Sequence, residues 1–175
     1  MILRFRPNAR DRVRRVPRPL LAVGLGFVLA VWVSPAAAQD RVALVVGNSA
    51  YDGLPALVNP GNDARLIGER LTAIGFEVSI VLDASQGALT AAVDDFSEAA
   101  RGAEVALFYY AGHGLQIDGQ NYLIPIDADI GSQADVPAVS TSLTNVLDTI
   151  EGAGAESVVV VLDACRDNPL ADIPG

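Results

Sequence analysis

The fold of this 175-residue chain is decided by two stretches, VALFYYAGHG at residues 105–114 and VVVVLDAC at residues 158–165. Each stretch opens with a continuous apolar run, which is typical of a strand buried on both faces of a parallel sheet. Each run then gives way to small and polar residues, where we expect the strand to end. The first run leads to the only histidine of the chain, His113, and the second leads to the only cysteine, Cys165.

The rest of the chain after residue 40 alternates strands with helices. Apolar runs predict two further strands, at residues 41–46 and 76–82. Apolar residues at helical spacing, bounded by capping residues, predict three helices. The helices follow Asn59-Pro60, Ser85, and either Thr141 or Ser142, and the first two end at Gly75 and Gly102.

Two features separate the third strand from the third helix. Residues 115–127 hold Asp118-Gly119 between two short apolar segments, which predicts a small hairpin. Residues 130–139 are polar and rich in turn-forming residues, so we predict a surface loop there.

Alternating strands and helices indicate an α/β fold with a mostly parallel sheet covered on both faces. In such sheets, binding and catalytic sites form beyond the carboxyl ends of the strands. His113 and Cys165 both follow predicted strands, so we expect neighbouring strands to deliver the imidazole and the thiol to the same edge.

A thiol and an imidazole at one edge suit nucleophilic catalysis. A free cysteine has a pKa of about 8.5, which falls beside an imidazolium, and an imidazole can exchange its proton near neutral pH. The developing oxyanion needs donors, which we assign to the backbone N–H groups of Gly114 and Cys165. Gly112 and Gly114 flank His113 without side chains, so a substrate backbone could approach. The alternative is a structural histidine and an inert buried cysteine.

Residues 109–114 (YYAGHG) together with residues 163–166 (DACR) resemble the caspase/metacaspase family, peptidase C14. The separation of about 50 residues between histidine and cysteine is a known feature of that family. Further similar segments lie at residues 43–51, 59–64 and 121–128. The resemblance covers about residues 41–170. It implies a caspase–haemoglobinase-like three-layer sandwich, in which a mostly parallel sheet of strand order 2-1-3-4 is flanked by helices.

The resemblance also implies a cysteine-type endopeptidase and a preference in its substrates. Animal caspases that cleave after Asp carry Gln at the position of Asp163. Metacaspases cleave after Arg or Lys, and hold that cation with acids at the positions of Asp163 and Asp63. Two carboxylates in a partly dry cleft favour a guanidinium. Alternatively, Asp63 is a first-turn acid favoured by the helix dipole, and Asp163 satisfies loop backbone.

The charge of the chain narrows its partners and cofactors. After residue 40, five arginines stand against nineteen acidic residues, a net charge of −14. Such a domain repels nucleic acid and favours cationic partners, here protein or peptide substrates with a basic residue at the cleaved bond. Four loop acids do not have the spacing of an EF-hand and are interpreted as solvated: Asp118, Asp127, Asp129 and Asp135. We therefore expect no cofactor; metacaspases can depend on calcium, but the resemblance transfers no ligands.

The N-terminal region is predicted to be targeting material. Seven arginines come before or at residue 18, an apolar run follows at residues 20–33, and three alanines end at Ala38. This order predicts a signal peptide over residues 1–38, and export to the periplasm or the medium. The alternative is a membrane anchor formed by residues 20–38, but the apolar run itself is shorter than the ~20 residues that a spanning helix needs, and the longer stretch includes Pro35.

Residues 41–175 are predicted to be the large-subunit-like catalytic domain. Because the chain ends ten residues after Cys165, we expect the fold to stop after the fourth core strand, without the small-subunit-like portion of family members. The exposed edge of that strand would need a small-subunit-like partner or a second copy. Two other functions remain open: a caspase-like scaffold without catalysis, and a different thiol hydrolase or transferase.

Overall fold

The computed structural model of the chain describes residues 41–165, and of Cys165 the backbone alone. The predicted signal peptide at residues 1–38 and Arg166 of the DACR motif lie outside the described residues. Within residues 41–165, none of the helices is both long enough and apolar enough to cross a membrane.

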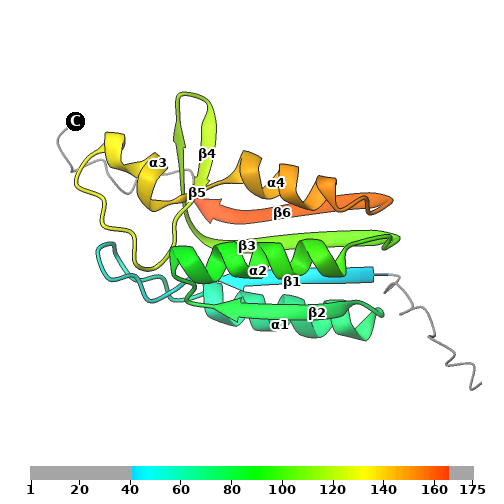
Figure 1. Cartoon of the computed structure of the whole chain (residues 1–175). Helices are drawn as coiled ribbons and strands as arrows, with labels where there is room; N and C mark the ends of the chain where they lie inside the picture. The colour runs from blue at the N-terminus through cyan, green and yellow to red at the C-terminus, as the bar shows by residue number, and fades with distance from the viewer. Residues whose placement is uncertain (1–40, 166–175) are drawn as a thin grey trace, which may run out of the picture. The chain divides into compact units, whose positions relative to one another are not determined.

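The described residues form strands and helices that alternate along the chain (Figure 1). The strands are β1 (Arg41–Gly47), β2 (Glu77–Leu82), β3 (Val105–Ile117), β4 (Gln120–Leu123), β5 (Thr141–Ser142) and β6 (Ser157–Cys165). The helices are α1 (Pro60–Ala73), α2 (Gln86–Ala99), the 3₁₀ turn η1 (Gln133–Asp135), the single turn α3 (Val136–Val139) and α4 (Leu143–Gly152).

Four parallel strands in the order β2-β1-β3-β6 form the centre of the sheet. This confirms the predicted order 2-1-3-4. The short strands β4 and β5 continue antiparallel from the far half of β3, and the β3–β4 hairpin stands away from the parallel sheet (Figure 1). Helix α1 packs on one face and helices α2 and α4 on the other, so the predicted three-layer α/β sandwich is also confirmed.

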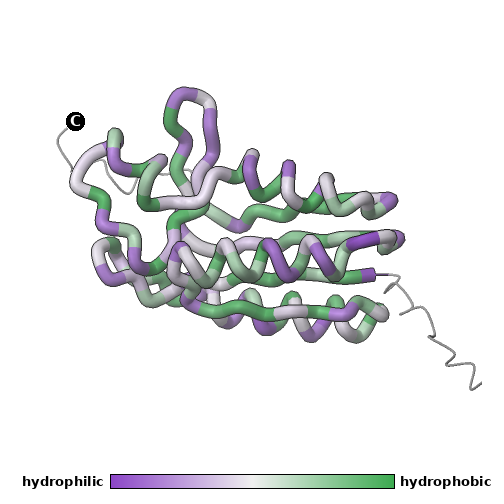
Figure 2. Tube along the Cα trace, viewed as in Figure 1, coloured by the Kyte–Doolittle hydropathy of each residue, from purple (hydrophilic) through white to green (hydrophobic). Residues whose placement is uncertain are grey.

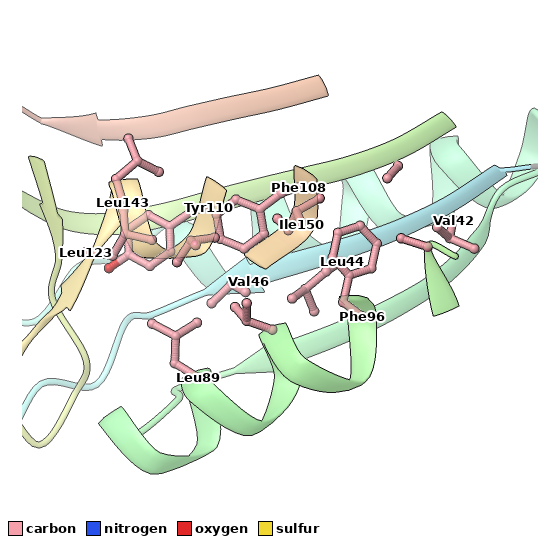
Figure 3. Packing of buried hydrophobic residues seen from close by; sticks show 14 of the residues in the cluster. Val42, Leu44, Val46, Leu89, Phe96, Phe108, Tyr110, Leu123, Leu143 and Ile150 are labelled. Atoms are coloured by element: carbon pink, nitrogen blue, oxygen red, sulfur yellow. The ribbon is translucent and has the colours of Figure 1, made fainter. Parts of the chain in front are cut away.

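Strict alternation along β1 supplies both faces of the core. Val42, Leu44 and Val46 pack with the apolar sides of α2 and α4 (Figure 3), whereas Ala43 and Val45 pack towards α1. Figure 2 shows the consequence in hydropathy: the central strands are mostly hydrophobic, whereas hydrophilic and hydrophobic residues alternate around the helices. A strand that is buried on both faces has no polar side.

Strand β3 is longer than predicted. We expected it to end at Tyr110, but it runs through Gly112 and His113 to Ile117. The reason is a change of partner: β6 pairs with β3 as far as His113, and β4 pairs with it from Gly114 onwards. The hairpin prediction is confirmed, with the turn at Asp118-Gly119.

Tertiary contacts refine one local prediction and correct another. Asn59 is the N-cap of α1 and Pro60 its first residue, as predicted, but the Asn59 side chain makes no capping hydrogen bond; the N–H of Gly61 donates instead to Ser49 Oγ at 3.1 Å. Residues 130–139 are more than a surface loop, because they contain η1 and α3 and bury Ile130 and Val136 in an apolar cluster.

The contact between β1 and α1 depends on Gly47. A Cβ atom at this position would lie 2.5 Å from the carbonyl oxygen of Pro60 and 2.7 Å from Cβ of Ala64. Both neighbours belong to the first turns of α1, and one of them is backbone. The helix could not keep its place beside any larger residue, so this glycine sets how closely α1 approaches the sheet.

We predict that Gly47→Ala lowers the free energy of unfolding by about 1–3 kcal/mol, because overpacking forces backbone to shift. The matched control is Gly87→Ala in α2, where an added Cβ meets no atom within 4 Å; helix propensity there favours alanine by up to about 1 kcal/mol. Urea denaturation of both variants measures the difference. Equal stability of the two variants would contradict the proposed contact.

Candidate active site

His113 and Cys165 are paired residues of neighbouring parallel strands. The register between β3 and β6 runs from Val105↔Ser157 to His113↔Cys165. Neighbouring strands lie about 4.8 Å apart, so the two backbones are adjacent where β6 ends. The structure therefore brings these two residues to one edge of the sheet, as the sequence predicted.

The imidazole of His113 is held by a backbone carbonyl. Its Nε2 lies 2.8 Å from the carbonyl oxygen of Pro55, in the loop between β1 and α1. A carbonyl oxygen can only accept a hydrogen bond, so Nε2 carries the proton in this arrangement. In the neutral ring Nδ1 then has a free lone pair, and it is the nitrogen that can take up another proton.

Tyr51 holds His113 from the same loop. Its hydroxyl oxygen accepts a hydrogen bond from the backbone N–H of His113 at 2.8 Å, and the two rings lie with centroids 4.5 Å apart at an angle of 54°. Tyr51 is itself buried, and burial raises its pKa, so the phenol stays neutral. The loop thus contacts both the ring and the main chain of His113.

A second phenol, that of Tyr110 in β3 itself, contacts the same segment of the strand. Tyr110 is fully buried, and its hydroxyl lies 2.9 Å from each of two carbonyl oxygens, those of His113 and Ile124. A Cβ atom at Gly112 would lie 2.6 Å from the hydroxyl oxygen of Tyr51 and 2.8 Å from that of Tyr110. We expected Gly112 to leave room for a substrate, but the phenols fill the space where its side chain would lie.

The N–H of Gly114 faces away from β4. The carbonyl oxygen of His113 accepts from the N–H of Ile124 at 3.1 Å, so that carbonyl points towards β4. The C=O of His113 and the N–H of Gly114 belong to one trans peptide unit and point in opposite directions. The N–H of Gly114 is therefore directed to the side of β3 on which β6 ends.

The two predicted acids lie around Tyr109. The Tyr109 hydroxyl donates to Asp163 Oδ2 at 3.0 Å. Burial raises the pKa of Tyr109, the hydrogen bond to Asp163 and its negative charge raise it further, and Asp63 adds to the effect. Asp63 is also a first-turn acid of α1, as the alternative reading of the sequence held. Among residues 41–165 neither acid forms an ion pair.

Two of the four loop acids are used by the fold. Asp127 Oδ1 accepts from the N–H of Gln86 at the start of α2, and Asp135 accepts from the N–H and the hydroxyl of Ser132. Across the described part of the chain, no three His, Cys, Asp or Glu side chains gather in a way that could hold a metal ion.

Comparison with known sequences assigns the family. The family model of peptidase C14, described as the caspase domain, matches residues 40–174. The chain belongs to the caspase domain family. It is 30% identical over 129 residues, or 74% of its length, to mucosa-associated lymphoid tissue lymphoma translocation protein 1 of Homo sapiens and to the homolog of that protein in Mus musculus. The chain spans 15% of the length of each of these relatives.

Sequence reasoning about this caspase domain missed the residues that hold the predicted ones. Tyr51, Tyr109 and Tyr110 lie within the segments that carry the family resemblance, which was the available signal. Nothing in their spacing indicated which groups they contact. Pro55 acts through its carbonyl oxygen, which every residue possesses, so no side-chain pattern could have indicated it.

We predict that the neutral imidazole of this caspase domain is protonated at Nε2, because only that tautomer can donate to the carbonyl oxygen of Pro55. His113 is the only histidine of the chain, so an untagged sample gives one set of imidazole signals. Long-range ¹H–¹⁵N correlation spectra at a pH where the ring is neutral identify the tautomer directly. A neutral ring protonated at Nδ1 would contradict the site geometry.

Proposed function

We propose that this caspase domain is a cysteine endopeptidase in which Cys165 is the nucleophile and His113 moves the proton. One observation carries the proposal: His113 is the register partner of Cys165 and has its Nε2 committed to Pro55, which leaves Nδ1 free for the thiol. A structural histidine would be expected to have both ring nitrogens satisfied by the fold.

The chemistry follows from these groups. Nδ1 of His113 accepts the thiol proton, and the sulfur forms a bond to the carbonyl carbon of the substrate. The electron pair of the C=O bond moves to oxygen, where the N–H groups of Gly114 and Cys165 donate to it. The carbon–nitrogen bond then breaks, and the imidazolium returns its proton to the leaving amine. Water, deprotonated by Nδ1, hydrolyses the thioester and regenerates the thiol.

We further propose that cleavage follows Arg or Lys, with Asp63 and Asp163 holding the basic side chain. The proposal is supported by two carboxylates that both act on the buried hydroxyl of Tyr109 and that have no described cationic partner. Two carboxylates without an ion-pair partner, Asp63 half-buried and Asp163 exposed, favour a cation. An acidic substrate side chain would be repelled.

A partner over the edge of β6 belongs to the same proposal. Among the described strands, β6 pairs with β3 alone, and three of its apolar side chains are about two-fifths exposed: Val159 at 40%, Val161 at 42% and Leu162 at 42%. An uncovered apolar edge strand favours pairing with another strand. A small-subunit-like segment or a second copy of the chain would cover it.

We place the enzyme outside the cytoplasm, in keeping with the predicted signal peptide.

The decisive prediction is that Cys165 is labelled by a thiol-trapping peptide ending in Arg and not by the matched peptide ending in Asp. Mass spectrometry of the full chain locates the adduct. Cys165→Ala removes labelling, and His113→Ala slows it by at least about 100-fold, the usual contribution of a general base.

The outcomes separate the candidate functions. Equal labelling by both peptides would refute the preference for a basic residue and leave the nucleophile intact. No labelling of a folded sample, with or without an added partner, would favour a scaffold without catalysis.

We also predict that Asp63→Asn and Asp163→Asn each lower kcat/KM for an Arg substrate by about 10–100-fold, since a hydrogen bond to a charged group contributes about 1.5–3 kcal/mol. The matched control is Asp148→Asn, an exposed acid on α4 with the same change of charge. Steady-state kinetics of the three variants measure the effect. Equal losses in all three would mean that net charge, rather than a site, attracts the substrate.

A further inference from the structure

We propose that Tyr109 is a specificity-determining residue of this site, because its hydroxyl fixes the Asp163 carboxylate in an orientation that favours the planar guanidinium of Arg over the ammonium of Lys. The inference rests on the proposed function, in which Asp63 and Asp163 hold a basic side chain. It goes further by naming the group that makes Arg preferred to Lys.

The first step is the position of Tyr109. In the parallel register Ala111 pairs with Asp163, and paired residues of adjacent strands point to the same face. Tyr109 is two residues before Ala111, so it also lies on that face. It packs in the cluster beneath α1 and is only 5% exposed, yet its hydroxyl emerges from this cluster to meet Asp163 Oδ2 at 3.0 Å.

The Tyr109 hydroxyl stays protonated and can always donate to Asp163. A phenol donates only while it is protonated, and the burial of Tyr109 and the nearby carboxylates raise its pKa above the ordinary value. The hydroxyl is therefore a donor over the whole pH range in which a peptidase works. Its aromatic ring is held by the core on which it packs, so the donor is rigid as well as permanent.

The Asp163 carboxylate keeps hydrogen-bond acceptors that a ligand can use. An ionised carboxylate can accept about four hydrogen bonds, and Tyr109 uses one of them on Oδ2. No other hydrogen bond to the Asp163 side chain forms within residues 41–165, and rotation of its carboxylate about the Cβ–Cγ bond would move Oδ2 away from the Tyr109 hydroxyl. A carboxylate of fixed plane matches the parallel N–H groups of a guanidinium, whereas an ammonium is a point charge that tolerates any plane.

The other phenols of the site do not have this role. Tyr51 and Tyr110 contact the backbone of β3 around His113, and no hydrogen bond joins either of them to a carboxylate within residues 41–165. Among these three tyrosines, Tyr109 alone donates a hydrogen bond to one of the two acids. The substitution Tyr109→Phe therefore removes the hydroxyl that holds Asp163 and leaves the contacts of His113 unchanged.

The experiment compares Tyr109→Phe with the wild type on two peptide substrates that differ only in Arg or Lys at the cleaved bond. We expect kcat/KM to fall about tenfold for Arg and about twofold for Lys, the size expected when one hydrogen bond to a charged group is lost. Tyr122→Phe on β4 is the matched control, because no described hydrogen bond involves that hydroxyl. Asp163→Glu is a second variant, which keeps the charge but moves the carboxylate, and it should lower the same ratio.

Binding separates this inference from the proposed function. In a Cys165→Ala background, calorimetric titration with the same two peptides measures the Arg-to-Lys affinity ratio without any chemistry. A fall of this ratio in Tyr109→Phe supports the role of Tyr109 even if the wild type hydrolyses neither peptide, in which case the proposed function alone fails. An unchanged ratio, equal losses for both peptides, or no binding of either peptide would overturn the inference. The alkylation rate of Cys165 by iodoacetamide should stay the same in Tyr109→Phe, and a large change would also count against it.

Discussion

Parallel backbone pairing between β3 and β6 is the constraint on which the site depends. The pairing holds His113 opposite Cys165. The separation of their backbones is therefore set by the sheet and does not depend on the conformation of a loop. The same strand then turns its other edge to β4, because the carbonyl of His113 accepts from Ile124. His113 thus lies where the partner strand of β3 changes from β6 to β4. This change leaves the N–H of Gly114 directed towards the end of β6. In the proposed mechanism the proton acceptor, His113, and one oxyanion donor, Gly114, are consecutive residues of the same strand.

The loop between β1 and α1 links the fold to this strand. Asn48 is fully buried and binds the backbone of two other segments, at Ala84 and Ile124, so the beginning of the loop is anchored in the core. Tyr51 and Pro55, further along, then hold the main chain and the ring of the histidine. The contacts of Asn48 are buried and that of Tyr51 is partly buried, so losing one of them costs more than the bond alone. The loop therefore supports both folding and the orientation of the imidazole.

Electrostatics and burial act together at the acidic side of the site. The described domain has few cations, and two of its four arginines are paired with glutamates on the surface, Arg41 with Glu104 and Arg101 with Glu98. Within residues 41–165 neither Asp63 nor Asp163 forms an ion pair, and Asp163 accepts instead from the neutral hydroxyl of Tyr109. The buried phenol of Tyr109 donates one hydrogen bond to Asp163, whereas an internal arginine would occupy the place of the ligand.

The sequence by itself determined the fold class, the strand order implied by the resemblance, and the meeting of His113 and Cys165. Those follow from apolar runs and from the rule that parallel strands share their carboxyl edge, which needs no knowledge of side-chain contacts. Only the tertiary structure decided that β3 continues beyond the histidine, that Gly112 is packed against phenols, and that Tyr109 holds Asp163. Each of these arises between segments far apart in the chain, where the packing of the whole core selects the neighbour. The local sequence pattern contains no such information, because a tyrosine fits it equally well whether its hydroxyl contacts water, a carbonyl or a carboxylate.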